Sequence, residues 1–216
     1  MMKNLMYKEC KLALHPTTFL FWLLSAMLLI PSYPYYVLFF YTCLGVFFIC
    51  LSGRENKDIA YTMLLPVRKG DIVRARIATA CGVELMQAVI AVPFALIRNF
   101  IFPMNNAAGM EANVALFGIS PALMGAFNLV FFPRYYRGPD KVGMPFLLGS
   151  VTYFVLLAVF ESFTFFVPFF RDVLDTKDPQ FLGAKLAVFA AGALVFVICN
   201  LLACRISEKR FEKLDL

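Results

Sequence analysis

The stretch that decides the fold is residues 35–76, YYVLFFYTCLGVFFICLSGRENKDIAYTMLLPVRKGDIVRAR. Its first part, Tyr35–Leu51, carries no charged side chain, and a continuous apolar run of about this length is typical of a helix that crosses a ~30 Å hydrocarbon core. The remainder is dense in charge, yet its middle reads IAYTMLLP, which is too apolar to leave in water and too short to cross a bilayer. The stretch therefore predicts a membrane helix followed by a charged loop that buries an apolar segment of its own.

The composition of the whole chain extends this interpretation. The 216 residues are 61% hydrophobic and 16% charged, with a mean hydropathy of +0.76. A soluble domain averages about 45–50% apolar and about a quarter charged residues, so a single globular core cannot absorb this excess. The apolar runs are continuous and do not alternate with polar residues, which favours membrane-spanning helices over a membrane β-barrel.

We predict an all-α, polytopic membrane protein that forms one transmembrane domain over residues 1–216. The six predicted spans are Pro16–Ile30, Tyr35–Leu51, Ile72–Ile97, Ala112–Phe132, Pro145–Phe169 and Phe181–Cys204. The first is short and ends at Pro31 and Pro34, so a re-entrant helical pair is the alternative for that segment.

Residues 1–15 predict a short helix that lies in the headgroup plane. Apolar side chains fall on one helical side and Asn4, Lys8 and Lys11 on the other, a pattern typical of interfacial helices. The segment imitates a signal peptide, but no small-residue cleavage site follows Ile30, which favours an uncleaved anchor.

The distribution of Lys and Arg predicts the orientation. With the N-terminus inside, only Arg98, Arg171, Lys177 and Lys185 of the twenty basic residues face outward, and the other sixteen lie in cytoplasmic segments. Both termini and the loop 54–71 are therefore expected in the cytoplasm, in contact with membrane lipid. Because the net charge of +6 reflects this topology, we expect no nucleic-acid partner.

Motifs for catalysis are missing from the sequence. It contains no GxxxxGK[ST] phosphate loop, no HExxH and no GxSxG, and His15 is its single histidine. We therefore predict that the chain is not an enzyme, has no metal site and binds no cofactor. The charged segment RDVLDTKD, residues 171–178, is interpreted as a solvated external turn.

Three polar residues inside the predicted spans are candidates for a translocation path: Glu84, Gln87 and Glu161. A carboxyl group at membrane depth is costly and is expected to face a cavity or a partner. The alternative is that each group is protonated or hydrogen-bonded between helices for packing alone. Gly183, Ala187 and Ala191 recur every four residues in the last span, which favours close packing within one subunit over the alternative of a subunit interface.

The charged loop predicts a helix of about three turns from Asn56 to Leu65. Asn56 or a neighbour can cap its start, and Pro66 disfavours helical geometry at Leu65 and so ends it. Spacing of four residues relates Ile59 to Met63 and Tyr61 to Leu65, which predicts a broad apolar side.

A second short unit, VRKGDIVRAR, follows this helix. In it Gly70 is expected to form a turn, Asp71 to cap the next helix, and Arg74 and Arg76 to anchor the third span at the headgroups. For the predicted helix Asn56–Leu65, two partners are possible: another protein or the inner leaflet of the membrane covers its apolar side.

The segment ENKDIAYTMLLPVRKGDIVRAR resembles the first cytoplasmic loop of type-2 ABC exporter permeases. In that family an acidic and amide-rich helix leads into an LP-x-x-[RK]-x-x-[IV] turn, which reads Leu65-Pro66-Val67-Arg68-Lys69-Gly70-Asp71-Ile72 here. Within the family, the short chain without a large external domain resembles bacterial exporters of amphipathic and antimicrobial peptides, such as the phenol-soluble-modulin exporter permease.

The resemblance implies a bacterial plasma-membrane permease that pairs with a separate ATP-binding subunit, which uses ATP and Mg, and with a second copy of itself. It implies that the loop helix is a coupling helix seated in a groove of the ATPase, and that the substrate is a hydrophobic or amphipathic peptide. The coupling residues are then Glu55, Asn56, Lys57, Asp58, Ile59, Tyr61, Met63, Leu64, Leu65, Pro66 and Arg68.

An ATP-independent secondary carrier or a toxin-immunity membrane protein is the alternative. A carrier typically shows internal repeats and several charges near the bilayer middle. The first three and last three predicted spans show no repeat, and Glu84 and Glu161 are their only deep carboxyl groups. These observations favour the permease.

Overall fold

The computed structural model describes residues 2–13, 15–102 and 106–214, and each regular element within these residues is helical. Five helices are long and apolar enough to cross a membrane. They are α3 (Tyr35–Glu55), α5 (Lys69–Ile101), α6 (Val114–Tyr135), α7 (Gly143–Phe166) and α8 (Leu182–Glu212). They confirm five predicted spans to within a few residues, except that α8 continues well past Cys204.

The N-terminal segment is a bent pair of helices. Helix α1 (Met2–Lys8) and the π-helix η1 (Glu9–Ala13) precede α2 (Thr17–Leu23) and the 3₁₀-helix η2 (Leu24–Leu29), and the two halves meet at 81°. Together α2 and η2 rise only ~22 Å, less than the ~30 Å hydrocarbon core. The segment makes a sixth candidate span only if the pair is counted as one.

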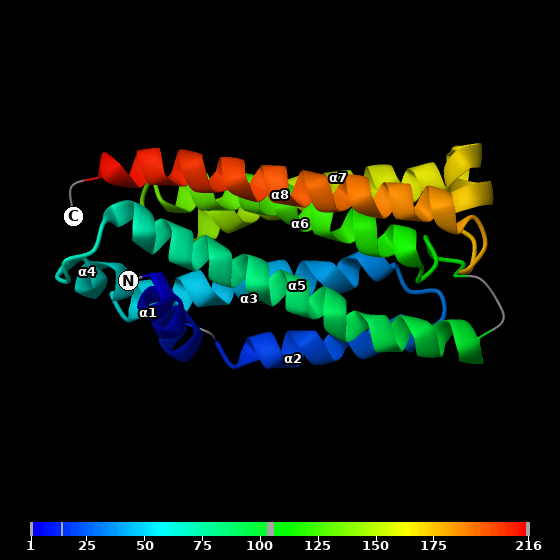
Figure 1. Cartoon of the computed structure of the whole chain (residues 1–216), viewed down its shortest axis with the longest axis horizontal. Helices are drawn as coiled ribbons and strands as arrows, with labels where there is room; N and C mark the ends of the chain where they lie inside the picture. Colours follow the sequence, from blue (N-terminus) through cyan, green and yellow to red (C-terminus); the bar gives the residue numbers. More distant parts are fainter. Residues whose placement is uncertain (1, 14, 103–105, 215–216) are drawn as a thin grey trace.

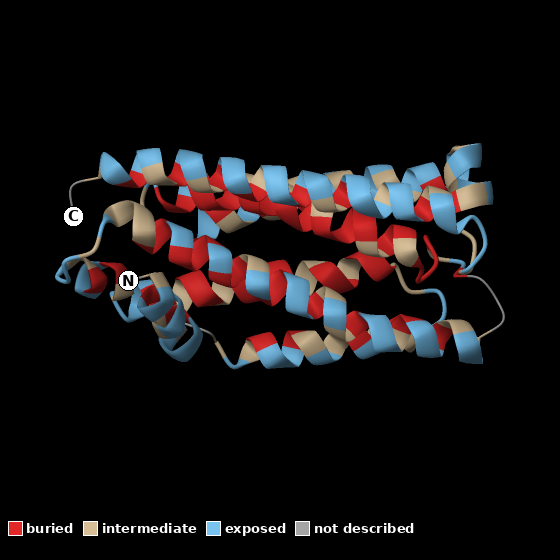
Figure 2. Ribbon diagram, in the orientation of Figure 1, coloured by how far each residue is buried: buried red, intermediate tan, exposed pale blue. Residues whose placement is uncertain are grey.

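The helices lie side by side along the long axis of the molecule (Figure 1). Helices α7 and α8 pack on α6 at one side, and α2 packs on α3 and α5 at the other. Helix α6 is central. Of the most apolar 18 residues of each helix, 67% are buried in α6, against 17% in α7 and 22% in α8. Burial therefore concentrates in the middle of the bundle, and the outer helices expose their apolar faces (Figure 2).

Helices α6 and α8 touch through their backbones. A Cβ atom on Gly192 would lie 2.0 Å from the carbonyl oxygen of Gly118, and one on Gly118 would lie 2.4 Å from Cα of Phe189. The predicted packing stripe of Gly183, Ala187 and Ala191 is instead exposed on α8. The prediction that these three residues pack within one subunit was therefore wrong for the single chain. The buried side of α8 contains Gly192, the residue after Ala191.

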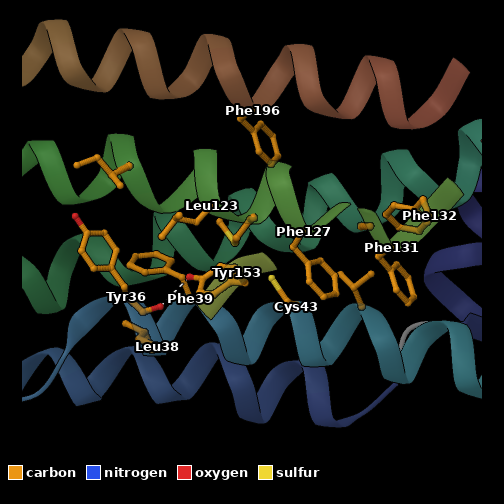
Figure 3. Packing of buried hydrophobic residues seen from close by; sticks show 14 of the residues in the cluster. Tyr36, Leu38, Phe39, Cys43, Leu123, Phe127, Phe131, Phe132, Tyr153 and Phe196 are labelled. Carbon is orange, nitrogen blue, oxygen red and sulfur yellow. Dashed lines mark hydrogen bonds between the residues drawn. The ribbon is translucent and has the colours of Figure 1, made fainter. Parts of the chain in front are cut away.

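Aromatic side chains fill the space between α3, α6 and α7 (Figure 3). Phe127, Phe131 and Tyr135 stack along α6, with ring centroids 5.3 Å and 5.9 Å apart. The hydroxyl of Tyr153 donates to the backbone oxygen of Tyr36 across 2.8 Å and joins α7 to α3. This aromatic layer therefore joins α3, α6 and α7 in the core of the bundle.

The loop between α3 and α5 contains the short helix α4 (Asp58–Met63). It is shorter than the predicted Asn56–Leu65 because α3 continues to Glu55 and Asn56 forms its C-cap. Lys57, in the left-handed region at φ 50°, occupies the N-cap of α4. The N-cap of α4 is thus a neighbour of Asn56, as the prediction allowed, although its side chain makes no capping hydrogen bond. Arg68 occupies the N-cap of α5, so the capping role predicted for Asp71 and the turn predicted at Gly70 were wrong.

The segment 171–178, which the sequence predicts to be an external turn, packs onto the start of α6. The side-chain amide of Asn113 donates to the carbonyl oxygens of Leu174 (2.7 Å) and Thr176 (2.8 Å), and the buried Lys185 donates to Asp178 (2.9 Å). The prediction of a solvated turn holds for the exposed Arg171–Asp172 pair only. The turn therefore fixes α6 and α8 at this end.

Asp175 lies in the same turn and accepts a hydrogen bond from the backbone N–H of Glu111 across 2.7 Å. Burial raises the pKa of Asp175 to about 7, and the nearby Glu111 carboxylate adds to the rise. The Glu111 N–H and Lys185 oppose it.

Candidate functional site

Helix α4 has two different faces. Ile59 is 8% exposed and packs in the core, and Met63 packs against that core. Tyr61, Leu64 and Leu65 point outward and are 66%, 82% and 55% exposed. The broad apolar side predicted for this helix is therefore divided between the core and the surface.

Eight of the predicted coupling residues are exposed, and we call them together the α4 surface. Its members are Glu55, Asn56, Lys57, Tyr61, Leu64, Leu65, Pro66 and Arg68. Ile59, Met63 and Asp58 face inward or are half-buried, so the structure separates them from the exposed set. Beside this surface a hollow of about 670 Å³ runs between α4 and the N-terminal segment, with Leu12, Tyr61 and Leu65 in its wall.

An ionic cluster lies beneath α4. Arg76 of α5 is 1% exposed and donates hydrogen bonds to both Glu9 of η1 and Asp58 of α4. Lys8 donates to Asp58 (2.6 Å) and to the hydroxyl of Thr62 (2.9 Å). Three segments far apart in sequence, namely the N-terminal segment, α4 and α5, are thereby joined at one point.

The cluster balances two cations against two carboxylates, as a buried ionic group requires. Partial burial acts to raise the pKa of Asp58, but Arg76 and Lys8 outweigh it and hold that pKa below its usual value. Space for the guanidinium comes from Gly53 of α3, where a Cβ atom would lie 2.8 Å from an Arg76 nitrogen. The cluster is therefore charged, paired and tightly enclosed.

Two predictions are corrected here. Arg76 does not anchor α5 at the headgroups, because it is buried in this cluster, whereas the exposed Arg74 pairs with Glu208 of α8 across 2.6 Å. Asp58 faces its own chain and not the α4 surface. Sequence reasoning missed Glu9, whose only signal is an acidic residue within a basic segment.

The predicted path residues Glu84 and Gln87 are buried inside the bundle. The carboxylate of Glu84 accepts hydrogen bonds of 3.0 and 2.9 Å from the side-chain amide of Asn128 in α6, which also donates to Asn200 of α8. Gln87 donates to the hydroxyl of Ser25 across 2.9 Å. Sequence reasoning did not single out these partners, since amide and hydroxyl residues inside spans are common.

Glu161 lies apart from this network. It is half-buried in α7, and a Cβ atom on Gly109 would lie 2.0 Å from one of its oxygens. Within the described residues no hydrogen bond or ion pair joins Glu161 to Glu84 or Gln87. The assignment of these three residues to one translocation path stays a prediction.

Comparison with known families identifies the chain. A family model described as "ABC-2 family transporter protein" matches residues 4–212. No curated protein and no solved structure matches the chain. The match covers the five spans, α4 and most of the N-terminal segment, and members of this family normally work with an ABC ATP-binding subunit. This multi-pass membrane protein therefore belongs to the ABC-2 family of transporter proteins.

Proposed function

We propose that this chain is the permease subunit of an ATP-driven exporter, in which two copies of the chain pair with two copies of an ATPase that uses ATP and Mg. In this proposal the ATPase seats α4 as a coupling helix, α1 lies in the headgroup plane, and the bent pair counts as the first of six spans. The substrate is a hydrophobic or amphipathic peptide, exported across a bacterial plasma membrane.

The observation that carries the proposal is the α4 surface. The short helix α4 and its C-cap leave Tyr61 and Leu64 largely exposed, and large apolar side chains side by side suit burial against a partner or lipid. Their charged neighbours, including Lys57 and Arg68, suit a protein groove that is apolar at its centre and polar at its rim.

The ionic cluster supplies a mechanical connection. Because Arg76 bonds to Asp58 of α4 and to Glu9 of η1, a displacement of α4 acts on the start of α5 and on the N-terminal segment together. Helix α5 continues from that point to Ile101 and carries Glu84 and Gln87 on the way. Movement of an ATPase at α4 can thus reach the middle of the bundle.

Glu84 and Gln87 then act on the path through helix packing. Both bond within one chain, to α6 and to the α2–η2 segment respectively, so they govern how these helices meet around a path between two copies. We expect Glu84→Gln, which keeps an acceptor oxygen for the Asn128 amide, to retain substrate-stimulated ATP hydrolysis, and Glu84→Ala to lose most of it. Equal activity of the two variants in reconstituted complexes would contradict this role.

The test of the proposed function is capture of the ATPase. The permease carrying Leu64→Glu or Tyr61→Glu is co-expressed with candidate ABC ATP-binding subunits from the same organism, and co-purification is measured. We expect at least tenfold less ATPase on either variant, since a buried, unpaired carboxylate in an interface is costly. The matched control is Tyr7→Glu, because Tyr7 is 65% exposed against 66% for Tyr61.

Undiminished capture by both α4 variants would overturn the coupling assignment. The same holds if no ATPase co-purifies with the unaltered chain although the chain is folded and inserted. An ATP-independent carrier or a toxin-immunity protein would then take the place of the exporter.

A further inference from the structure

Two hollows lie at the α6–α7 loop, one beside the start of α7 and the other beside the C-terminal end of α8. The first, about 450 Å³, is lined by Arg134, Arg137, Gly138, Asp140, Lys141, Met144, Pro145 and Leu148. The second, about 410 Å³, is lined by Arg137, Arg210, Lys213 and Leu214. Arg137 lines both hollows, and we call the two together the cradle; their walls carry five cationic side chains and one carboxylate.

None of these cations is paired with a carboxylate among the described residues, and hydrogen bonds position two of them. Among the residues that the structure describes, no ion pair joins any of the five to a carboxylate, Asp140 included. Carbonyl groups hold two of them: Arg134 donates to the oxygen of Val130 (3.0 Å) and Arg210 to that of Pro133 (2.8 Å). Elsewhere at this end of the molecule, Arg74 and Arg76 both have carboxylate partners. Over the described residues, the cradle therefore carries a surplus of positive charge that a ligand can use.

The cradle sits where a membrane span begins. Arg134 belongs to the last turn of α6, and its bond to Val130 directs the guanidinium back along the helix, toward the span. Met144 and Leu148 belong to the first turns of α7 and are exposed. The hollow thus has cations at the level of lipid headgroups and an apolar wall that continues into the hydrocarbon.

We propose that the cradle binds an acidic phospholipid. Arg134, Arg137 and Lys141 would hold its phosphate, and an acyl chain would lie along Met144 and Leu148. Guanidinium groups bind phosphate oxygens in pairs, and basic pockets beside membrane spans suit anionic headgroups. The leaflet is the inner one if the proposed orientation holds; the binding itself does not depend on the proposed function.

A lipid fits the cradle better than a soluble anion or a protein. A free phosphate would use the cations but leave the wall of Met144 and Leu148 uncovered. A protein partner could reach the loop, but not the face of α7 that continues into the span. The ligand needs one end that is anionic and one that is apolar.

The test uses the full chain in mild detergent and native mass spectrometry. Binding of phosphatidylglycerol is titrated against phosphatidylcholine, with glycerol 3-phosphate as a soluble competitor. The test variant is Arg134→Gln/Arg137→Gln/Lys141→Gln, and the control variant Lys3→Gln/Arg205→Gln/Lys209→Gln removes the same charge from exposed positions outside the cradle. Thermal unfolding verifies that both variants are folded.

We expect the unaltered chain to prefer phosphatidylglycerol, and the test variant to bind it at least about tenfold more weakly while the control variant does not change. If the triple variant unfolds early, Arg137→Gln alone is used, since this side chain lines both hollows. A weakening of at least threefold is then expected.

Equal phosphatidylglycerol binding by the test and control variants overturns the proposal. Effective competition by glycerol 3-phosphate would make the cradle a site for a soluble anion. Unchanged lipid binding together with loss of the ATPase from the test variant would assign the cradle to the protein partner instead.

Discussion

Arg76 shows how one residue can decide the arrangement of three segments. Its guanidinium is enclosed by Glu9, Asp58 and the backbone of Gly53, and it has no access to water. An arginine in such a place cannot lose its proton, so its carboxylates must stay with it. The N-terminal segment and α4 are therefore held on α5 by electrostatics as well as by apolar packing.

We expect Arg76→Ala to lower the free energy of unfolding by about 3–5 kcal/mol, because it leaves two carboxylates without their buried partner. The measurement is thermal or denaturant unfolding of the purified chain in detergent. Arg74→Ala is the control, since Arg74 is exposed and pairs with Glu208 at the surface, and it should change little. Similar losses in the two variants would mean that the cluster does not stabilise the fold.

Single residues were also where sequence reasoning failed most. Arg74 and Arg76 stand two positions apart and read alike in sequence, yet one is exposed and the other buried. The difference depends on Glu9, which is 67 positions from Arg76. Contacts at that separation follow from how helices pack, and a local pattern holds no information about them.

At the scale of elements, the long helices were predictable and their partners were not. In lipid, a continuous apolar run of ~20 residues must satisfy its backbone hydrogen bonds internally and therefore forms a helix. For this reason α3, α5, α6 and α7 lie close to their predicted limits. The contact between α6 and α8 was not predictable, because Gly118, Gly125 and Gly192 are three glycines among twelve. The more regular stripe of Gly183, Ala187 and Ala191 predicted the packing face of α8 incorrectly, since these residues are exposed.

The turn that holds Asp175 gives a prediction about pH. Its pKa of about 7 lies above the ordinary value of 3.8, so between these values the folded chain keeps a proton that the unfolded chain has released. The free energy of unfolding should therefore fall as pH rises through this window. After allowance for solvent screening, we expect a loss of about 1–2 kcal/mol between pH 5 and pH 8.

Asp175→Asn, which resembles the protonated side chain, should remove this part of the pH dependence. Asp172→Asn is the control, because Asp172 pairs with Arg171 at the surface. Unfolding temperatures at pH 5 and pH 8 measure the difference. If the slope of the Asp175→Asn variant equals that of the unaltered chain, another group is responsible for it.

At the scale of the whole molecule, α1, α4 and the C-terminal end of α8 lie at the same end of the bundle (Figure 1). The same end holds the ionic cluster and the basic cradle, whereas Lys177 and Lys185 lie at the other. This arrangement agrees with the distribution of Lys and Arg along the sequence. It supports the proposal that this end faces the cytoplasm.

That orientation can be measured by cysteine labelling. In a variant without its native cysteines, a cysteine introduced at Asn4 or Lys213 should react with a membrane-impermeant maleimide only after the cells are permeabilised. One introduced at Arg171 should react in intact cells. Labelling of the Asn4 position in intact cells would mean either that the proposed orientation is wrong or that the bent N-terminal pair does not cross the membrane.

The glycine contact between α6 and α8 has a mechanical consequence. With no room for a single methyl group between Gly118 and Gly192, these helices cannot slide lengthwise past each other unless they first separate. Steric clashes therefore oppose a lengthwise shift of either helix alone. In any large rearrangement of the bundle, α6 and α8 are expected to move together as one rigid unit.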